Sequence, residues 1–354
     1  MRRLSCHFRR PARCRSAARR RRRLPIELTA DVNDVAVLEL RSETDRPTYC
    51  HSVWIDPFLS TESTRVSDPL DRVEFDNSRA RIRAPRCVAT VVTPNFVNLL
   101  DEMLASLRMS NPSTDIAVVV LAVDPDRACY EVAERHGAIT LPCTARRRPD
   151  PSIKSALYSV ARLVDAEGFL CLDADTLVLG DIAPLFAALE ACSRGTILAS
   201  ADQNRYTFDD LGRALTDLYQ ATESDIGRFV GAALGEARFP LVLNDGAFAG
   251  DRFALLSLDS AIRSMPGAPQ WVDTLWLRNQ FLFNLALARM RCAVQMDDVF
   301  NLQLHAQDVE LLRANGHISA SWRERPVRIL HFNATGRDKL RELRNSFASP
   351  DHIA

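Results

Sequence analysis

The chain has 354 residues, of which 47% are hydrophobic and 25% are charged, an ordinary globular composition for one large domain or two modest ones. Its longest uninterrupted apolar run, residues 116–123, is far shorter than the ~20 residues that a membrane-spanning helix needs, so no transmembrane segment is expected. The formal net charge is zero, but residues 1–23 hold eleven Arg and no acid, which leaves 34 basic against 45 acidic residues elsewhere and argues against a nucleic-acid-binding surface.

Two residue types are used in an unusual way. The nine Cys contain no C-x-x-C pair and are odd in number, which argues against a zinc site and a disulfide framework and favours a reducing cytoplasm. Of the 45 basic residues only Lys154 and Lys339 are Lys. They are either chance survivors of a bias toward Arg or positions that need a compact ammonium group.

The first 85 residues have no strong periodicity. Residues 1–23 lack the apolar region of a secretory signal. Their composition resembles a transit peptide, but we favour a disordered basic tail or a start upstream of the true one. Residues 24–85 alternate weakly between apolar and charged positions, which predicts a few short strands or an ill-ordered lead-in.

The periodicity becomes clear from residue 86, where the main domain is expected to begin and to extend to residue 340, before a C-terminal tail over 341–354. The pattern predicts, in chain order, a strand over 87–92, a helix over 96–109, a strand over 116–123, a helix over 127–136, a strand over 138–141, a helix over 152–166 capped by Ser152, and a strand over 169–172. Helical spacing returns over 206–232 and 251–264. Apolar strands that alternate with helices predict an α/β fold with a parallel sheet covered on both faces.

Functional side chains in such sheets gather beyond the carboxyl ends of the strands, which here indicates Thr93, Asn95 and the acidic pair after Leu172. This pair, Asp173 and Asp175, lies in the segment F-L-C-L-D-A-D-T-L-V-L at residues 169–179. Two neighbouring carboxylates repel each other and favour a cation, and hard oxygen ligands suit Mg²⁺ or Mn²⁺. The alternative is that both side chains cap the following turn and stay solvated.

Two families place D-x-D after a strand. In haloacid-dehalogenase-like phosphatases the first Asp is a nucleophile, but that motif has Gly where this chain has Thr176. Such enzymes also carry a Lys ahead of a second acidic pair, whereas Lys339 follows Asp297 and Asp298. A Mg²⁺-dependent phosphatase is therefore the weaker interpretation.

The second family is the GT-A-fold glycosyltransferases, and the chain resembles in particular the glycogenin-like and lipopolysaccharide-galactosyltransferase-like group called family 8. Six further segments resemble motifs of that family in the right order: V-V-T-P-N-F (91–96), A-S-A-D (199–202), L-N-D-G-A-F-A-G (243–250), R-N-Q-F-L-F-N-L-A-L (278–287), V-F-N (299–301) and I-L-H-F-N-A-T-G-R-D-K (329–339). The resemblance covers residues 86–340. It implies a Rossmann-like GT-A fold with a mixed, mainly parallel central sheet flanked by helices.

The resemblance also implies a set of site residues. Asp173, Asp175 and His331 would hold the Mn²⁺ or Mg²⁺ ion. The nucleotide diphosphate sugar would contact the following residues: Thr93, Asn95, Lys154, Asp173, Ala174, Asp202, Asn244, Gly246, Gly336 and Lys339. Gln280 would lie beneath the sugar, next to Asn279, where many members of the family have Asp. Asp245 is a substitute for that missing carboxylate.

The implied reaction is transfer of a hexose from a nucleotide diphosphate sugar, with UDP-sugars favoured, to a hydroxyl of a glycan or small-molecule acceptor. Family 8 enzymes retain the anomeric configuration, although no enzymic nucleophile is visible here. Because Asn279 replaces a carboxylate, a non-catalytic nucleotide-sugar-binding module of the same fold is a further alternative.

Overall fold

The structure is a computed structural model that describes residues 2–8, 35–42, 73–75, 82–112, 115–145, 153–203, 242–263, 278–304, 309–314 and 317–332. The chain divides into two compact units, Met1–Arg65 and Val66–Ala354. The first unit contains the parallel strand pair β1 (Arg2–Phe8) and β2 (Val35–Ser42). β1 lies within the segment 1–23 that the composition predicts to be a tail, and the other residues of that segment lie outside the described ones. Leu4, Cys6 and Phe8 alternate with polar residues in β1, which is the period of a strand.

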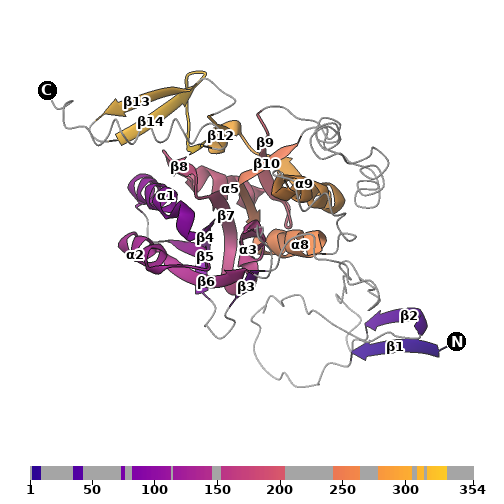
Figure 1. Cartoon of the computed structure of the whole chain (residues 1–354). Helices are drawn as coiled ribbons and strands as arrows, with labels where there is room; N and C mark the ends of the chain where they lie inside the picture. The colour runs from indigo at the N-terminus through magenta and orange to yellow at the C-terminus, as the bar shows by residue number, and fades with distance from the viewer. Residues whose placement is uncertain are drawn as a thin grey trace, which may run out of the picture. The chain divides into compact units, whose positions relative to one another are not determined.

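The second unit is built on an eight-stranded sheet (Figure 1). In spatial order its strands are β11 (Ala293–Gln295), β9 (Ile197–Ala201), β10 (Leu243–Asp251), β7 (Val164–Asp173), β4 (Ile82–Val92), β5 (Ile116–Val123), β6 (Ile139–Ala145) and β3 (Val73–Phe75). β4 is parallel to β5 and β7, β5 to β6, and β9 to β11, whereas β10 and β3 are antiparallel to their neighbours. The mixed, mainly parallel sheet is confirmed. The four strands that the apolar runs predict, β4, β5, β6 and β7, are parallel to one another as expected, and the antiparallel strands β10 and β3 were not among them.

Helices cover both faces of this sheet. They are α1 (Val97–Ser110), α2 (Arg127–Arg135), α3 (Lys154–Tyr158), α4 (Val160–Leu163), α5 (Ala183–Ala191), α8 (Arg252–Arg263) and α9 (Arg278–Met290), with 3₁₀ turns η1 (Pro94–Phe96) and η3 (Asp298–Phe300). α3, α4, α8 and α9 share one buried cluster with Cys87, Ala89 and Val91 of β4, and α1, α2 and α5 share another with Val88 and Val92. Alternate residues of one strand thus face two separate cores.

The structure differs from the predicted elements in the segment before the acidic pair. The helix expected over 152–166 is two short helices, α3 and α4, and β7 already begins at Val164, which pairs with Ile82 of β4. The residue before α3 is Ile153, without a side-chain cap, and Ser152 lies outside the described residues. Pairing with β4 across the whole length of β7 outweighs the helical pattern of 164–166.

The limits of the sheet also differ from the predicted boundaries. β4 begins at Ile82 and β3 pairs with β6, so the sheet starts before residue 86. β6 continues to Ala145, past the predicted end at 141. α8 occupies the helix predicted over 251–264, whereas the helix predicted over 206–232 and the tail over 341–354 lie outside the described residues.

Two three-stranded sheets complete the described part of this unit. One consists of β12 (Leu302–Gln303), β16 (Ile329–His331) and β8 (Thr176–Val178), and the other of β13 (Glu310–Ala314), β14 (His317–Trp322) and β15 (Arg325–Pro326). β16 is antiparallel to β8, which directly follows the acidic pair. Among the described helices, none has both the length and the apolar character needed to cross a bilayer.

Candidate metal and donor site

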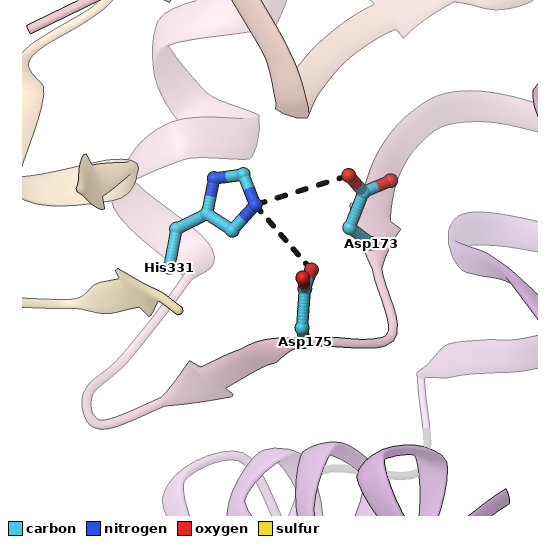
Figure 2. Close-up of side chains that lie close together, drawn as sticks. All are labelled: Asp173, Asp175 and His331. Carbon is cyan, nitrogen blue, oxygen red and sulfur yellow. Dashed lines mark ion pairs between the residues drawn. The ribbon is translucent and has the colours of Figure 1, made fainter. Parts of the chain in front are cut away.

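The acidic pair lies in a tight turn at the carboxyl end of β7. Asp173 is the last residue of β7 and lies opposite Val91 of β4, and Asp175 directly precedes β8. The Thr176 hydroxyl donates a hydrogen bond of 2.8 Å to the Asp173 carbonyl oxygen, which stabilises the turn. The turn places both carboxylates on one side, as Figure 2 shows. The alternative of two solvated turn caps does not hold, because Asp175 is buried and the Asp173 side chain is only 20% exposed.

His331 comes to this turn through strand pairing. The register of β16 against β8 pairs His331 with Thr176, and the Phe332 N–H donates to the Asp175 carbonyl oxygen at 2.8 Å. The buried His331 ring points Nε2 at Asp175 Oδ1, 3.4 Å away, and at Asp173 Oδ2, 3.8 Å away (Figure 2). The structure thus brings together the three residues predicted to bind a metal.

The spacing of these ligand atoms suits a small divalent cation. All three lie within 4.8 Å of one another, and the two separations from His331 are longer than good hydrogen bonds. Ligands about 2.1 Å from one octahedral ion lie about 3.0 Å apart in cis and about 4.2 Å in trans. Two carboxylates and an imidazole at these distances therefore fit Mg²⁺ or Mn²⁺.

Lys154 of α3 forms the other side of the acidic cluster. Its ammonium group is 2.8 Å from Asp173 Oδ2, 3.1 Å from Asp245 Oδ1 and 3.0 Å from the Asp245 carbonyl oxygen. Its three donors thus meet three acceptors. The Tyr158 hydroxyl donates to Asp245 Oδ2 at 2.9 Å. Tyr158 has no motif that predicts a role in the site, although it lies four residues after Lys154 on the same helix face.

The protonation of this cluster reflects its charges. Burial disfavours the charged form of Lys154, but Asp173 and Asp245 outweigh this effect and raise its pKa above the ordinary value. The pKa of Asp173 is raised to about 6, mainly by burial and also by Asp175 and Asp245, against the opposing effect of Lys154. One ammonium group does not compensate the neighbouring carboxylates, so the site favours a further cation.

A buried cluster of polar side chains, Asp202, Gln280 and Asn244, adjoins the acidic cluster. Gln280 Nε2 of α9 donates to Asp202 Oδ2 at 2.8 Å, and Asn244 Nδ2 of β10 donates to Gln280 Oε1 at 3.2 Å. The β9–β10 register shifts between Leu243 and Phe248, which takes Asn244, Asp245 and Gly246 out of regular pairing. Next to this irregular stretch, the Asn284 side-chain amide accepts from the N–H of Leu243 and donates to its carbonyl oxygen, each at 2.7 Å.

Hydrogen bonds link the polar cluster of Asp202, Gln280 and Asn244 to His331. Asn244 Oδ1 accepts from the Gly246 N–H and from Asn301 Nδ2, both at 2.9 Å, and Asn301 Oδ1 lies 3.1 Å from His331 Nδ1. A Cβ atom added at Gly246 would lie 1.9 Å from His331 Cε1, so only glycine leaves room for the ring. The sequence analysis quoted Asn301 within the motif V-F-N but assigned it no role.

The remaining predicted residues lie next to these clusters in the chain, at the same edge of the sheet, or outside the described residues. Ala174 is buried between the two acidic residues, and Asn279 is half-buried beside Gln280. Thr93 and Asn95 follow β4 at the same edge of the sheet, half-buried and exposed respectively. Gly336 and Lys339 lie outside the described residues. Asp297 of the phosphatase interpretation forms an ion pair with Arg325 and accepts from the Val299 N–H at the start of η3.

Comparison with known proteins gives a likeness of fold. No family model matches the chain, and no curated protein matches its sequence. Among solved structures, it is similar to the galactosyltransferase LgtC in complex with donor and acceptor sugar analogues, with 16% identity over 75% of this chain and 98% of that chain and a TM-score of 0.48. The bifunctional glycosyltransferase WbbM has 11% identity over 73% of this chain and 47% of its own, with a TM-score of 0.47. Mouse xyloside xylosyltransferase 1 has 14% identity over 72% and 99%, with a TM-score of 0.42.

Proposed function

We propose that this chain is a metal-dependent glycosyltransferase that moves a hexose from a nucleotide diphosphate sugar to an acceptor hydroxyl, with retention of configuration. The observation that carries the proposal is the convergence of Asp173, Asp175 and His331 beside the hydrogen-bonded cluster of Asp202, Gln280 and Asn244 at the carboxyl edge of the sheet. Carboxylates and imidazole hold a divalent cation, and the amides and the Asp202 carboxylate offer donors and acceptors for sugar hydroxyls. UDP-sugars are the favoured donors.

In this proposal Asp173, Asp175 and His331 would hold Mn²⁺ or Mg²⁺. When bound, the ion would neutralise negative charge that develops on the nucleoside diphosphate leaving group. Lys154 holds Asp173 and Asp245 in place through its three hydrogen bonds and keeps positive charge next to the cation site. Lys339 and Gly336 are proposed to meet the diphosphate, and Thr93 and Asn95 the nucleoside.

The polar cluster of Asp202, Gln280 and Asn244 would bind and orient the hexose. Gln280 is oriented at both ends of its amide, by Asp202 and by Asn244, so its position is preorganised. Asp245 is proposed as the substitute for the carboxylate missing at Asn279. Its carboxylate bonds Lys154 and Tyr158, and no hydrogen bond among the described residues joins it to Gln280. We therefore propose Gln280 with Asn279 beside the reacting sugar, and Asp245 as an acidic group between the sugar and Lys154.

The test is turnover of nucleotide sugars, as hydrolysis or transfer, with Mn²⁺ or Mg²⁺ and with chelator. Asp175→Ala and His331→Ala each remove one proposed ligand and are expected to lower kcat/KM at least about 100-fold, since the leaving group loses its charge stabilisation. Asp165→Ala is the matched control, because this half-exposed acid lies on the same strand, far from its carboxyl end. Wild-type activity in both ligand variants would contradict the site assignment.

The same material separates the alternatives. Metal-dependent binding of a nucleoside diphosphate in a calorimetric titration, with no donor turned over, would identify a non-catalytic binding module. A phosphoaspartate trapped on Asp173 would identify a phosphatase. A thermal-shift screen of nucleoside diphosphates and their sugars, with and without Mn²⁺, identifies the base first. The free cysteines include Cys87, Cys129, Cys143, Cys171, Cys192 and Cys292, and we propose a reducing compartment such as the cytoplasm as the place of action.

A further inference from the structure

The hydrogen bonds between Gly246 and His331 have a direction that follows from one unambiguous donor. The backbone N–H of Gly246 only donates, so Asn244 Oδ1, 2.9 Å away, is the acceptor. The Asn301 atom that is 2.9 Å from the same oxygen is therefore the NH₂ group. This leaves Asn301 Oδ1, which only accepts, 3.1 Å from His331 Nδ1, so Nδ1 carries a proton.

The same direction follows from the other end of the network. The Asp202 carboxylate accepts from Gln280 Nε2, which makes Gln280 Oε1 the acceptor for Asn244 Nδ2. Asn244 must then present its oxygen to Asn301, in agreement with the assignment from the Gly246 N–H. Two independent ends of one chain of bonds thus specify the same amide orientations.

We propose that Asn301 and Asn244 are positioning residues that hold His331 in the tautomer with its proton on Nδ1, so that the Nε2 lone pair faces the cation between Asp173 and Asp175. Figure 2 shows Nε2 toward the two carboxylates and the other ring nitrogen away from them. Metal-binding histidines generally depend on such a partner for the second nitrogen. The inference rests on the proposed function, because it requires a cation at this place.

Asn301 is itself firmly held and shielded from water. Its side chain is fully buried, and its carbonyl oxygen accepts from Gln203 Nε2 at 3.1 Å. Gln203 and Gln303 each accept from the other's backbone N–H through their side-chain oxygens, at 2.9 Å and 3.3 Å. These bonds connect the segment after β9 to β12. β12 pairs with β16, the strand that contains His331. Since water does not reach Asn301, no solvent molecule replaces its amide when it is removed.

The experiment measures Mn²⁺ affinity of the full chain by electron paramagnetic resonance, without nucleotide. Asn301→Leu keeps the side-chain volume but removes the acceptor, and is expected to weaken Mn²⁺ binding about 10- to 100-fold. Asn301→Asp keeps an acceptor for Nδ1–H but loses the donor to Asn244 Oδ1, and is expected to lose less Mn²⁺ affinity than Asn301→Leu. Asn111→Leu is the matched control, because Asn111 is also buried and makes two side-chain hydrogen bonds, to Gly180 and Ile182, outside this network.

A second measurement reads the tautomer directly. In ¹⁵N NMR spectra of the Mg²⁺-loaded protein, with His331→Gln used for assignment, the wild-type His331 is expected to carry its proton on Nδ1. A proton on Nε2 overturns the proposal, whether or not any variant folds, and so does a folded Asn301→Leu protein with wild-type Mn²⁺ affinity.

A different set of results would show that the proposed cation site itself is wrong. If the wild type does not bind Mn²⁺, or if His331→Ala binds it as tightly as the wild type, the proposed metal site is wrong. If His331→Ala weakens binding and Asn301→Leu does not, only the positioning role is wrong.

Discussion

Gly246 and Lys154 show how single residues set the geometry of the site. The ring of His331 occupies the space where any other residue at 246 would place its Cβ. Lys154 directs all three of its N–H donors at the acidic residues 173 and 245, a convergence that the planar guanidinium of Arg does not reproduce. A chain that uses Arg for nearly all its basic positions thus has Lys at a buried position where the shape of the cation matters.

Gly246→Ala tests the contact between β10 and the imidazole. The added Cβ would lie 1.9 Å from His331 Cε1, so the ring must move away from the carboxylates. We expect Mn²⁺ affinity, measured by calorimetry, to fall at least about 10-fold. Gly168→Ala is the control, because its Cβ would be 3.2 Å from the nearest Phe186 atom in a different part of the sheet. Equal Mn²⁺ affinity in the two variants would show that the close contact is unimportant.

At the scale of elements, β10 connects the core to the site. One end of the strand carries Asn244 and Asp245, and its middle carries Phe248, which is fully buried. The Phe248 ring lies 6.0 Å from the ring of Tyr158 and 5.0 Å from that of Phe283, measured between centroids. The Tyr158 hydroxyl in turn donates to Asp245. The aromatic rings that pack around Phe248 therefore support the acidic cluster through this hydrogen bond.

Phe248→Ala is expected to lower the free energy of unfolding by about 3–5 kcal/mol, because it opens a cavity in a fully packed cluster. Phe248→Leu removes less volume and should cost less than half of this. Urea unfolding followed by circular dichroism measures both values. A loss below about 1 kcal/mol for the alanine variant would mean that β10 does not depend on this aromatic packing.

At the scale of the whole molecule, the proposed cation site predicts that a divalent cation stabilises the folded state. A cation that binds only the folded chain stabilises it by RT ln(1 + [L]/Kd), about 2.7 kcal/mol at 100 times Kd. We expect Mn²⁺ to raise the melting temperature of the wild type, chelator to reverse the change, and Asp175→Asn to abolish it. K⁺ at the same ionic strength is the control, and an equal rise with K⁺ would indicate general screening instead of a site.

The sequence alone determined the local parts of this protein. Apolar runs and helical spacing identified β4, β5, β7, α1 and α2, and the position of Asp173 at a strand end identified the acidic turn, because these signals depend only on neighbouring residues. The motifs it singled out include the three proposed cation ligands, Asp173, Asp175 and His331, whose side chains the structure brings together.

Only the tertiary structure decided how distant segments meet. The antiparallel direction of β10, the start of β7 at Val164 and the role of Tyr158 depend on pairing and packing partners far away in the chain. The network from Asp202 to His331 joins five segments by four hydrogen bonds, and the sequence around a side-chain amide does not indicate which group it will bond. Hydrogen-bond direction is a property of three-dimensional contact, so no reading of the sequence could supply it.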